Sequence, residues 1–400
     1  AMNQHLGPDV MPAILDAGFN LDFVDDTVLA ERARAADGQV AIGQSSYRAI
    51  VLPDVERMPA ATLRAIEAFA KQGVHVFATR RTPALAPGYL ATPADHADVA
   101  AAAGRLFRGA APSGVFVAQD ADLAAALRSR LTPDMAVSAG AADIGFVHRR
   151  TDAADVYFVA NTSNTPHAFD ATFRVSAAAA EQWNPIDGSV AAVAVRRAPG
   201  TTGATVALDL APYASTVMVF PAGPSGPARR TPAVGARSAP APAPIDISTN
   251  WRVTFGPSGT PADWAALRSW TDDEATRHFS GVASYEKTVE VPAAMLGRGL
   301  AVRLDLGTPK AIEVGRLRTG MQAWLDAPVR EAAVVLVNGR RAGSAWCPPY
   351  AVEVTSLLRP GPNVIRVEVA NLAINHMAGR TLPDYKLLNL RYGTRFEPQD

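Results

Sequence analysis

The chain has 400 residues, enough for several domains at roughly 100–200 residues each. Its 38 basic and 38 acidic residues balance, so the composition predicts neither nucleic acid nor an anionic membrane as a partner. Cys347 is the single cysteine, which excludes an intrachain disulfide and a multi-cysteine metal site. No apolar run reaches the roughly 18–20 residues of a membrane span, and the opening residues lack the apolar core of a signal peptide.

The chain opens with alternating helix and strand patterns. Residues 9–17 predict a helix that ends at Gly18, since glycine readily adopts the positive φ that commonly closes a helix. Residues 19–23 alternate apolar and polar side chains and predict a strand. Asp25 or Asp26 is then suited to cap the next helix.

Three further segments predict a parallel sheet. Residues 49–52 and 74–78 are short apolar runs, and residues 59–72 between them place their large apolar side chains on one helical face. Strands that are apolar throughout are typical of parallel sheets covered by helices on both faces. We therefore predict a flavodoxin-like or amidotransferase-like α/β domain over residues 1–131.

A small β-sandwich is predicted for residues 132–220. Short strand-like segments alternate there with turn sequences such as residues 184–188, Asn-Pro-Ile-Asp-Gly. The predicted strands are residues 144–148, 156–160, 168–175, 189–195, 205–210 and 215–220.

The remaining chain is predicted to hold a linker and a second β-sandwich. Residues 221–244 contain seven prolines and almost no large apolar side chain, so burial cannot offset their ordering entropy. In residues 245–400, the turn at residues 338–339, Asn-Gly, joins two extended segments as in a β-hairpin. Residues 365–369 alternate apolar and charged side chains, as a half-buried antiparallel strand does.

Little in the first domain predicts catalysis or metal binding. An amidotransferase-like domain would need a nucleophilic Cys or Ser on a tight elbow beside a His, but no G-x-S-x-G motif occurs. His75 lies in an apolar strand and is interpreted as a core residue. Asp22, Asp25 and Asp26 could bind a metal ion, although helix capping explains the last two better. We expect no cofactor and no metal in this chain.

The third domain contains the candidate binding residues. Sugar rings stack their C–H faces on aromatic planes, while amides and charged groups bind the hydroxyls. Trp346 and Tyr350 flank a Cys-Pro-Pro loop, and Asn371, Asn375 and His376 follow the last clear strand. We predict that these five residues line a sugar-facing edge; alternatively, the tryptophan fills one end of the sandwich core. No carboxylate pair suited to glycoside hydrolysis is evident.

Several sequence segments resemble segments of known glycosidases. VLVNGRRAGSAWCPPYAVEVTSLLRPGPNVIRVEVANLAINHMAG resembles the sugar-binding β-sandwich of glycoside hydrolase family 2 and, more closely, the C-terminal region of family 106 α-L-rhamnosidases. The earlier phrases NLDFVDDTVL, VYFVANTSNTP, EQWNPIDGSV and SWTDDEATRHFSGVASYEKTVEVP also resemble family 106. The domain order favours family 106, because family 2 enzymes place this sandwich before their catalytic barrel.

The resemblance implies a bacterial enzyme that removes terminal α-L-rhamnose from plant or pectic glycosides with inversion. It also implies a glutamate pair and a calcium ion in an N-terminal (β/α)₈ barrel outside these 400 residues, and a galactose-binding-like jelly roll over residues 245–400. We therefore expect an accessory C-terminal fragment, inactive alone, whose partners are its own barrel and rhamnose-containing glycans. The resemblance favours a periplasmic or secreted location. His376 departs from the family pattern, which has an arginine there.

Two alternatives stay open. The chain could be a stand-alone carbohydrate-binding protein, which its loop aromatics and missing nucleophile motifs favour. A cryptic catalytic site between the first and third domains would instead require two carboxylates in one cleft.

Overall fold

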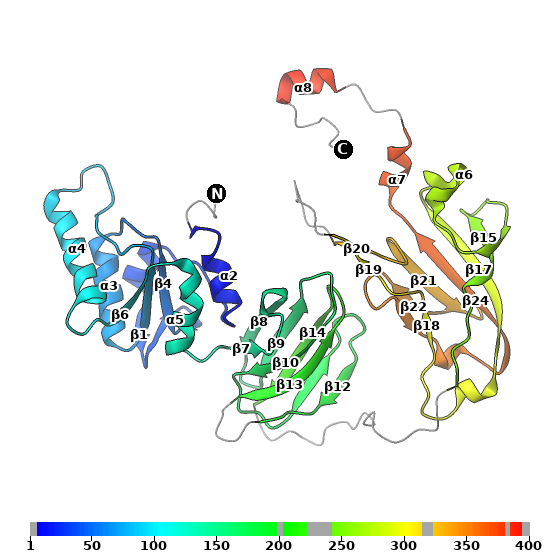
Figure 1. Cartoon of the computed structure of the whole chain (residues 1–400), viewed down its shortest axis with the longest axis horizontal. Coiled ribbons are helices and arrows are strands. Elements are labelled where there is room, and N and C mark those ends of the chain that lie inside the picture. Colours follow the sequence, from blue (N-terminus) through cyan, green and yellow to red (C-terminus); the bar gives the residue numbers. More distant parts are fainter. Residues whose placement is uncertain (1–5, 198–202, 223–241, 314–322, 381–384, 394–400) are drawn as a thin grey trace. The chain divides into compact units, whose positions relative to one another are not determined.

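The computed structural model describes residues 6–197, 203–222, 242–313, 323–380 and 385–393. The protein is mixed α/β, rich in β-sheet, and forms two compact units, Ala1–Ala233 and Val234–Asp400 (Figure 1). Most of the predicted linker, residues 221–244, lies outside the described residues. Within the ranges given above, no helix combines the length and apolarity needed to cross a membrane.

The first unit contains a parallel sheet of order β4-β5-β6. The parallel arrangement and the strands β4 and β5 were predicted, whereas β6 was not. Leu63 of α3 and Leu106 of α4 share a core on one face of this sheet. Val10 of α2 and Leu123 of α5 pack with Phe77 of β5 in a second core. The elements are α2 (Val10–Leu15), β4 (Ala49–Pro53), α3 (Ala60–Lys71), β5 (His75–Thr79), α4 (Pro93–Arg108), β6 (Gly114–Val117) and α5 (Leu123–Arg130).

The segment between α2 and β4 differs partly from its prediction. Gly18 follows α2 at φ +90°, and Asp25 precedes the helical turn that leads into the π-helix η1 (Val28–Arg32), where its carboxylate accepts from the Val28 N–H at 2.8 Å. Residues 19–23 form no strand; Asn20 bonds to the backbone of the edge strand β8 through its side chain. The structure instead contains an unpredicted antiparallel sheet, β1 (Arg34–Ala36), β2 (Gln39–Ile42) and β3 (Ser45–Tyr47).

The rest of the first unit consists of two antiparallel sheets around one core. Their orders are β13-β10-β7 and β12-β11-β14-β9-β8. Tyr157, Phe173 and Phe220 are almost fully buried in this core. The six predicted strands are present, whereas β7 and β11 were not predicted. The bounds are β7 (Met135–Val137), β8 (Ile144–Arg150), β9 (Ala154–Asn161), β10 (His167–Phe173), β11 (Ala180–Trp183), β12 (Val190–Val193), β13 (Ala204–Leu210) and β14 (Ser215–Pro221).

The second unit is built on a six-stranded antiparallel sheet of order β16-β15-β17-β24-β21-β22. The predicted hairpin joins β21 to β22, with positive φ at both Asn338 and Gly339. The pair β18–β23 contributes Leu304 and Val352 to the same core. The bounds are β15 (Thr249–Phe255), β16 (Ala262–Ala266), β17 (Val282–Val291), β18 (Arg303–Asp305), β21 (Ala332–Val337), β22 (Arg340–Ala345), β23 (Ala351–Glu353) and β24 (Gly361–Ala370), with the short pair β19 (Lys310–Ala311) and β20 (Leu325–Asp326) and the helices α6 (Glu274–Arg277), α7 (Ala373–Ala378) and α8 (Lys386–Tyr392).

Candidate functional site

The predicted sugar-facing residues fall at one end of the six-stranded sheet. Ala345 of β22 pairs with Ala333 of β21, which pairs with Val369 of β24. Trp346 and Asn371 therefore leave the sheet at the same end. Trp346 is 57% exposed, so its indole is accessible to a ligand.

Tyr350, by contrast, is a core residue. It is only 5% exposed and packs in the same cluster as Val352 and Leu304. Burial raises the pKa of its hydroxyl. Its ring therefore stabilises the sandwich and does not present a face to a sugar.

The two predicted asparagines hold the loop that precedes β17. Asn371 Nδ2 donates to the Phe279 carbonyl at 2.7 Å, and its Oδ1 accepts from the Gly281 N–H at 3.0 Å. Asn375 Nδ2 donates to the carbonyls of Arg277 and Phe279 at 3.0 and 2.8 Å. Both side-chain amides are thus engaged with the backbone of residues 277–281.

His376 is joined to the same loop through its backbone. Its N–H donates to Ser280 Oγ at 2.9 Å, and Arg380 lies 3.0 Å from its ring nitrogen Nε2. The residue is exposed. The structure therefore brings Asn371, Asn375 and His376 together against one loop.

The loop aromatics of this end pack against one another. The rings of Trp270 and Phe279 lie 5.6 Å apart, and Phe279 contacts Phe255 at 5.1 Å, both edge to face. Trp270 Nε1 also donates to the Tyr285 hydroxyl at 2.6 Å. These edge-to-face contacts and the hydrogen bond stabilise the loop. Trp346, by contrast, is 57% exposed.

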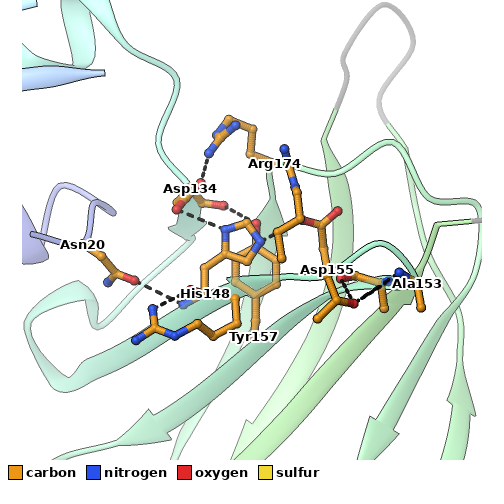
Figure 2. A network of polar contacts seen from close by, with 11 residues as sticks. Asn20, Asp134, His148, Ala153, Asp155, Tyr157 and Arg174 are labelled. Atoms are coloured by element: carbon orange, nitrogen blue, oxygen red, sulfur yellow. Dashed lines mark hydrogen bonds and ion pairs between the residues drawn. The ribbon is translucent and has the colours of Figure 1, made fainter. Parts of the chain in front are cut away.

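A second polar cluster, which the sequence did not predict, surrounds His148 in the first unit (Figure 2). His148 Nδ1 lies 3.3 Å from Asp134 Oδ2, and Nε2 lies 2.8 Å from Asp155 Oδ1. Arg174 pairs with Asp134, and Arg150 Nε donates to Asp155 at 2.8 Å. The signal that could have identified it is the position of His148, two residues along β8 from Phe146, on the inward face, where a polar ring needs partners.

This cluster joins three parts of the first unit. Asp134 directly precedes β7, Asp155 belongs to β9, and His148 to β8. Asn20, from the first predicted domain, accepts from the His148 N–H at 3.2 Å and donates to the Phe146 carbonyl at 2.9 Å. The contacts fix both sheets and the segment after α2 to one another.

The electrostatics of the cluster oppose a role as general acid. Burial raises the pKa of the Asp134 carboxyl, but the hydrogen bond from His148 and the charges of Arg174 and His148 outweigh it, so the net pKa lies below the usual value. An inverting glycosidase needs one carboxylic acid with a raised pKa. Both ring nitrogens of His148 are also engaged. The arrangement is therefore suited to holding the structure together.

Metal binding was considered for Asp22, Asp25 and Asp26. In the structure Asp25 is a helix cap, and Asp22 Oδ2 accepts from the Tyr47 hydroxyl at 2.7 Å. Across the described ranges, no three His, Cys, Asp or Glu side chains gather as a metal site would require. His75 is half-buried in β5, and burial lowers its pKa.

Comparisons with known proteins show which class of protein the chain is similar to. Residues 5–197 match the model of the family described as alpha-L-rhamnosidase, glycoside hydrolase family 106. The match covers slightly less than half of the chain and confirms the predicted resemblance to glycoside hydrolase family 106.

Solved and curated relatives extend this comparison. The fold is similar to that of a rhamnosidase from Novosphingobium sp. PP1Y, with a TM-score of 0.68, 24% identity, and coverage of 91% of this chain and 33% of that chain. A putative beta-glucuronidase from Formosa agariphila is 30% identical over 148 residues, which are 34% of this chain and 11% of that protein. A beta-glucuronidase from Ruminococcus gnavus gives a TM-score of 0.24 at 17% identity, over 31% of this chain and 21% of that one. The chain thus spans a minor part of each relative.

Proposed function

We propose that this chain is the accessory, non-catalytic region of an α-L-rhamnosidase whose catalytic barrel lies outside these 400 residues. The observation that carries the proposal is the family 106 match over residues 5–197, in a chain that covers 33% of a rhamnosidase of similar fold. The finer fold assignments belong to the same proposal: a flavodoxin-like or amidotransferase-like α/β domain and a galactose-binding-like jelly roll.

Two carboxylates whose pKa values lie below the ordinary value, those of Glu67 and Asp134, support an accessory role. Glu67 is ion-paired with Arg105 and Lys71, at 2.9 and 3.1 Å, and Asp134 with Arg174. Carboxylates held this way stay ionised and cannot donate a proton to a leaving group. Other acids, such as Glu286 with Arg366 at 2.8 Å, form ion pairs on exposed strand faces.

The whole enzyme would hydrolyse terminal α-L-rhamnose from plant or pectic glycosides with inversion. Its barrel would supply the glutamate pair and a calcium ion, and this chain would brace the barrel. Trp346 and the loop held by Asn371 and Asn375 would form part of the rim that meets the glycan. A periplasmic or secreted location fits such substrates.

Hydrolysis of an aryl α-L-rhamnoside tests the proposal. The 400-residue chain alone is expected to give no turnover, whereas the gene product that includes the barrel hydrolyses the substrate. The released sugar, followed by NMR, should first appear as the inverted anomer. Turnover by the 400-residue chain itself would contradict the accessory role.

A second candidate is a stand-alone carbohydrate-binding protein, which the exposed indole of Trp346 favours. The coding sequence upstream of Met2 separates the two candidates. A barrel with two glutamates there supports the rhamnosidase, and a stop codon or secretion signal supports the binding protein.

A further inference from the structure

One sheet of the first unit carries an apolar row across all five of its strands. The register pairs Val190 with Trp183, Trp183 with Val217, Val217 with Phe158, and Phe158 with Val147. Directly paired residues of antiparallel strands point to the same face. Because neighbouring strands lie about 4.8 Å apart, the row extends about 19 Å across the sheet.

This row lies on the outer face of the sheet. Tyr157 and Met218, the chain neighbours of Phe158 and Val217, are fully buried in the core, so alternation places the row on the opposite side. Its exposed fractions are 46% for Val190, 43% for Trp183, 41% for Phe158 and 44% for Val147. An antiparallel sheet usually presents polar side chains to water on its outer face, so this face has the composition of a covered surface.

The row continues into a hollow at the edge of the sheet. The hollow has a volume of about 300 Å³, and its lining includes Val147, Phe158 and Ala160 of the sheet together with Leu15 of α2. Leu15 is itself 42% exposed. Row and hollow form one contiguous apolar surface, which we call the outer apolar face, and surfaces of this kind mark protein interfaces.

The outer apolar face is held rigidly. The hydrogen bonds from Asn20 to the Phe146 carbonyl and from the His148 N–H to Asn20 fix β8 against the segment that follows α2. His148 is fixed in turn by Asp134 and Asp155. A preformed surface avoids the entropic cost of ordering side chains when a partner docks.

Two observations bear on what covers this face. Leu15 belongs to α2, which lies near the amino-terminal end of the described residues, so polypeptide attached on the amino side of α2 is tethered near the hollow. The rhamnosidase of similar fold is about three times as long as the part that this chain covers. We infer that the outer apolar face is the docking surface for the catalytic barrel of the same polypeptide, an inference that rests on the proposed function.

Hydroxyl-radical footprinting with mass spectrometry tests the docking. Modification rates of Trp183 and Phe158 are measured in the 400-residue chain and in the longer gene product that includes the barrel. Both side chains should be modified several-fold more slowly in the longer protein. Equal rates in the two proteins would overturn the inference.

Matched variants separate docking from folding. Phe158→Glu places a charge on the outer apolar face, and Phe116→Glu places one at a similarly exposed phenylalanine of β6, at 46% against 41%. In the 400-residue chain both variants should unfold at nearly the wild-type midpoint. In the longer protein, Phe158→Glu alone should restore Trp183 modification and speed proteolysis between the barrel and α2; an unchanged pattern would contradict docking.

Other occupants give distinguishable results. A 400-residue chain that sediments as a dimer, and as a monomer after Phe158→Glu, would assign the face to a second copy. Protection of Trp183 in the monomeric 400-residue chain would assign it to the second unit. Either result overturns the inference.

Hydrolysis of the aryl α-L-rhamnoside by the longer protein is measured separately from docking. If the longer protein is active but the outer apolar face is not protected, only the docking is refuted. If the face is protected but the longer protein is inactive, only the proposed function is refuted.

Discussion

The imidazole of His148 lies flat on the phenol ring of Tyr157, with the ring centroids 4.0 Å apart and the planes inclined by 6°. Tyr157 is fully buried, and burial raises the pKa of its hydroxyl. The stack seats the imidazole on the core while its edge meets Asp134 and Asp155. His148 therefore connects the apolar core of the sandwich to the polar cluster that contains Asp134 and Asp155.

Replacement of His148 by phenylalanine should destabilise the first unit by about 3 kcal/mol, the sum of two lost bonds at the low end of the range for charged groups. The aromatic stack on Tyr157 is kept, but Asp134 and Asp155 each lose a hydrogen bond to the imidazole, and bonds to charged groups contribute about 1.5–3 kcal/mol. Urea unfolding followed by circular dichroism measures the change. His376→Phe, at an exposed position, is the matched control and should leave the midpoint unchanged. An unaltered midpoint for His148→Phe would show that the hydrogen bonds from His148 to Asp134 and Asp155 contribute nothing to stability.

The lowered pKa of the Glu67 carboxyl predicts how the stability of the first unit depends on pH. The hydrogen bond from Arg105 lowers the pKa of its carboxyl to about 2, from an ordinary value of 4.5. A lowered folded-state pKa contributes stability that is present above 4.5 and is lost as the pH falls through the folded value. Glu67→Gln should therefore be less stable than wild type at pH 7, and the difference should shrink between about pH 4.5 and pH 2. Unfolding midpoints across this range measure it.

The control for Glu67 is Glu56→Gln. Glu56 forms ion pairs with Arg57 and Arg81, but its side chain is 50% exposed, and exposed pairs contribute at most about 1 kcal/mol. Its effect should be small at every pH. A constant difference between wild type and Glu67→Gln down to pH 2 would contradict the pairing with Arg105.

Two residues at the end of the six-stranded sheet are expected to have different roles, Asn375 in stability and Trp346 in binding. Asn375→Ala removes two hydrogen bonds to the carbonyls of Arg277 and Phe279 and should destabilise the second unit by about 1–2 kcal/mol. Trp346→Ala should leave stability unchanged, because the indole is 57% exposed, and should weaken α-L-rhamnoside binding in isothermal titration. Unchanged affinity in Trp346→Ala would remove this residue from the predicted sugar-facing edge.

The sequence correctly predicted the elements whose formation depends mainly on neighbouring residues in the chain. The apolar runs of β4 and β5 and the one-sided helix α3 were predicted because burial on both faces of a parallel sheet imposes that pattern. The hairpin at Asn338 and Gly339 followed from the positive φ that its turn requires.

What the patterns missed depends on contacts between distant residues. Residues 19–23 alternate like a strand, yet a strand forms only where its backbone pairs with another strand, which alternation cannot report. β7 has only three residues and forms a strand because it pairs with β10, a contact that its own sequence does not indicate. Tyr350 was predicted at a sugar-facing edge because its neighbours are turn-forming prolines, whereas the fold of that loop turns the ring into the core. The partners of His148 come from three separate segments, so no local motif marks them.

Gly18 offers a test of the junction between the helical and β-rich parts of the first unit. It has φ +90°, its carbonyl accepts from the Asp134 N–H at 2.9 Å, and a Cβ added there would overlap the Met135 carbonyl. Gly18→Ala should therefore cost about 3 kcal/mol or more, since it adds steric overlap to the 1–2 kcal/mol of a left-handed non-glycine residue. Gly88→Ala is the matched control: φ there is +98° with no atom within 4 Å of the added Cβ, so only the conformational cost applies. Because the overlap displaces Asp134, Gly18→Ala should also reduce the effect of His148→Phe in a double-mutant cycle. Equal destabilisation by the two alanine variants, with additive effects in the cycle, would mean that Gly18 acts through its backbone conformation alone.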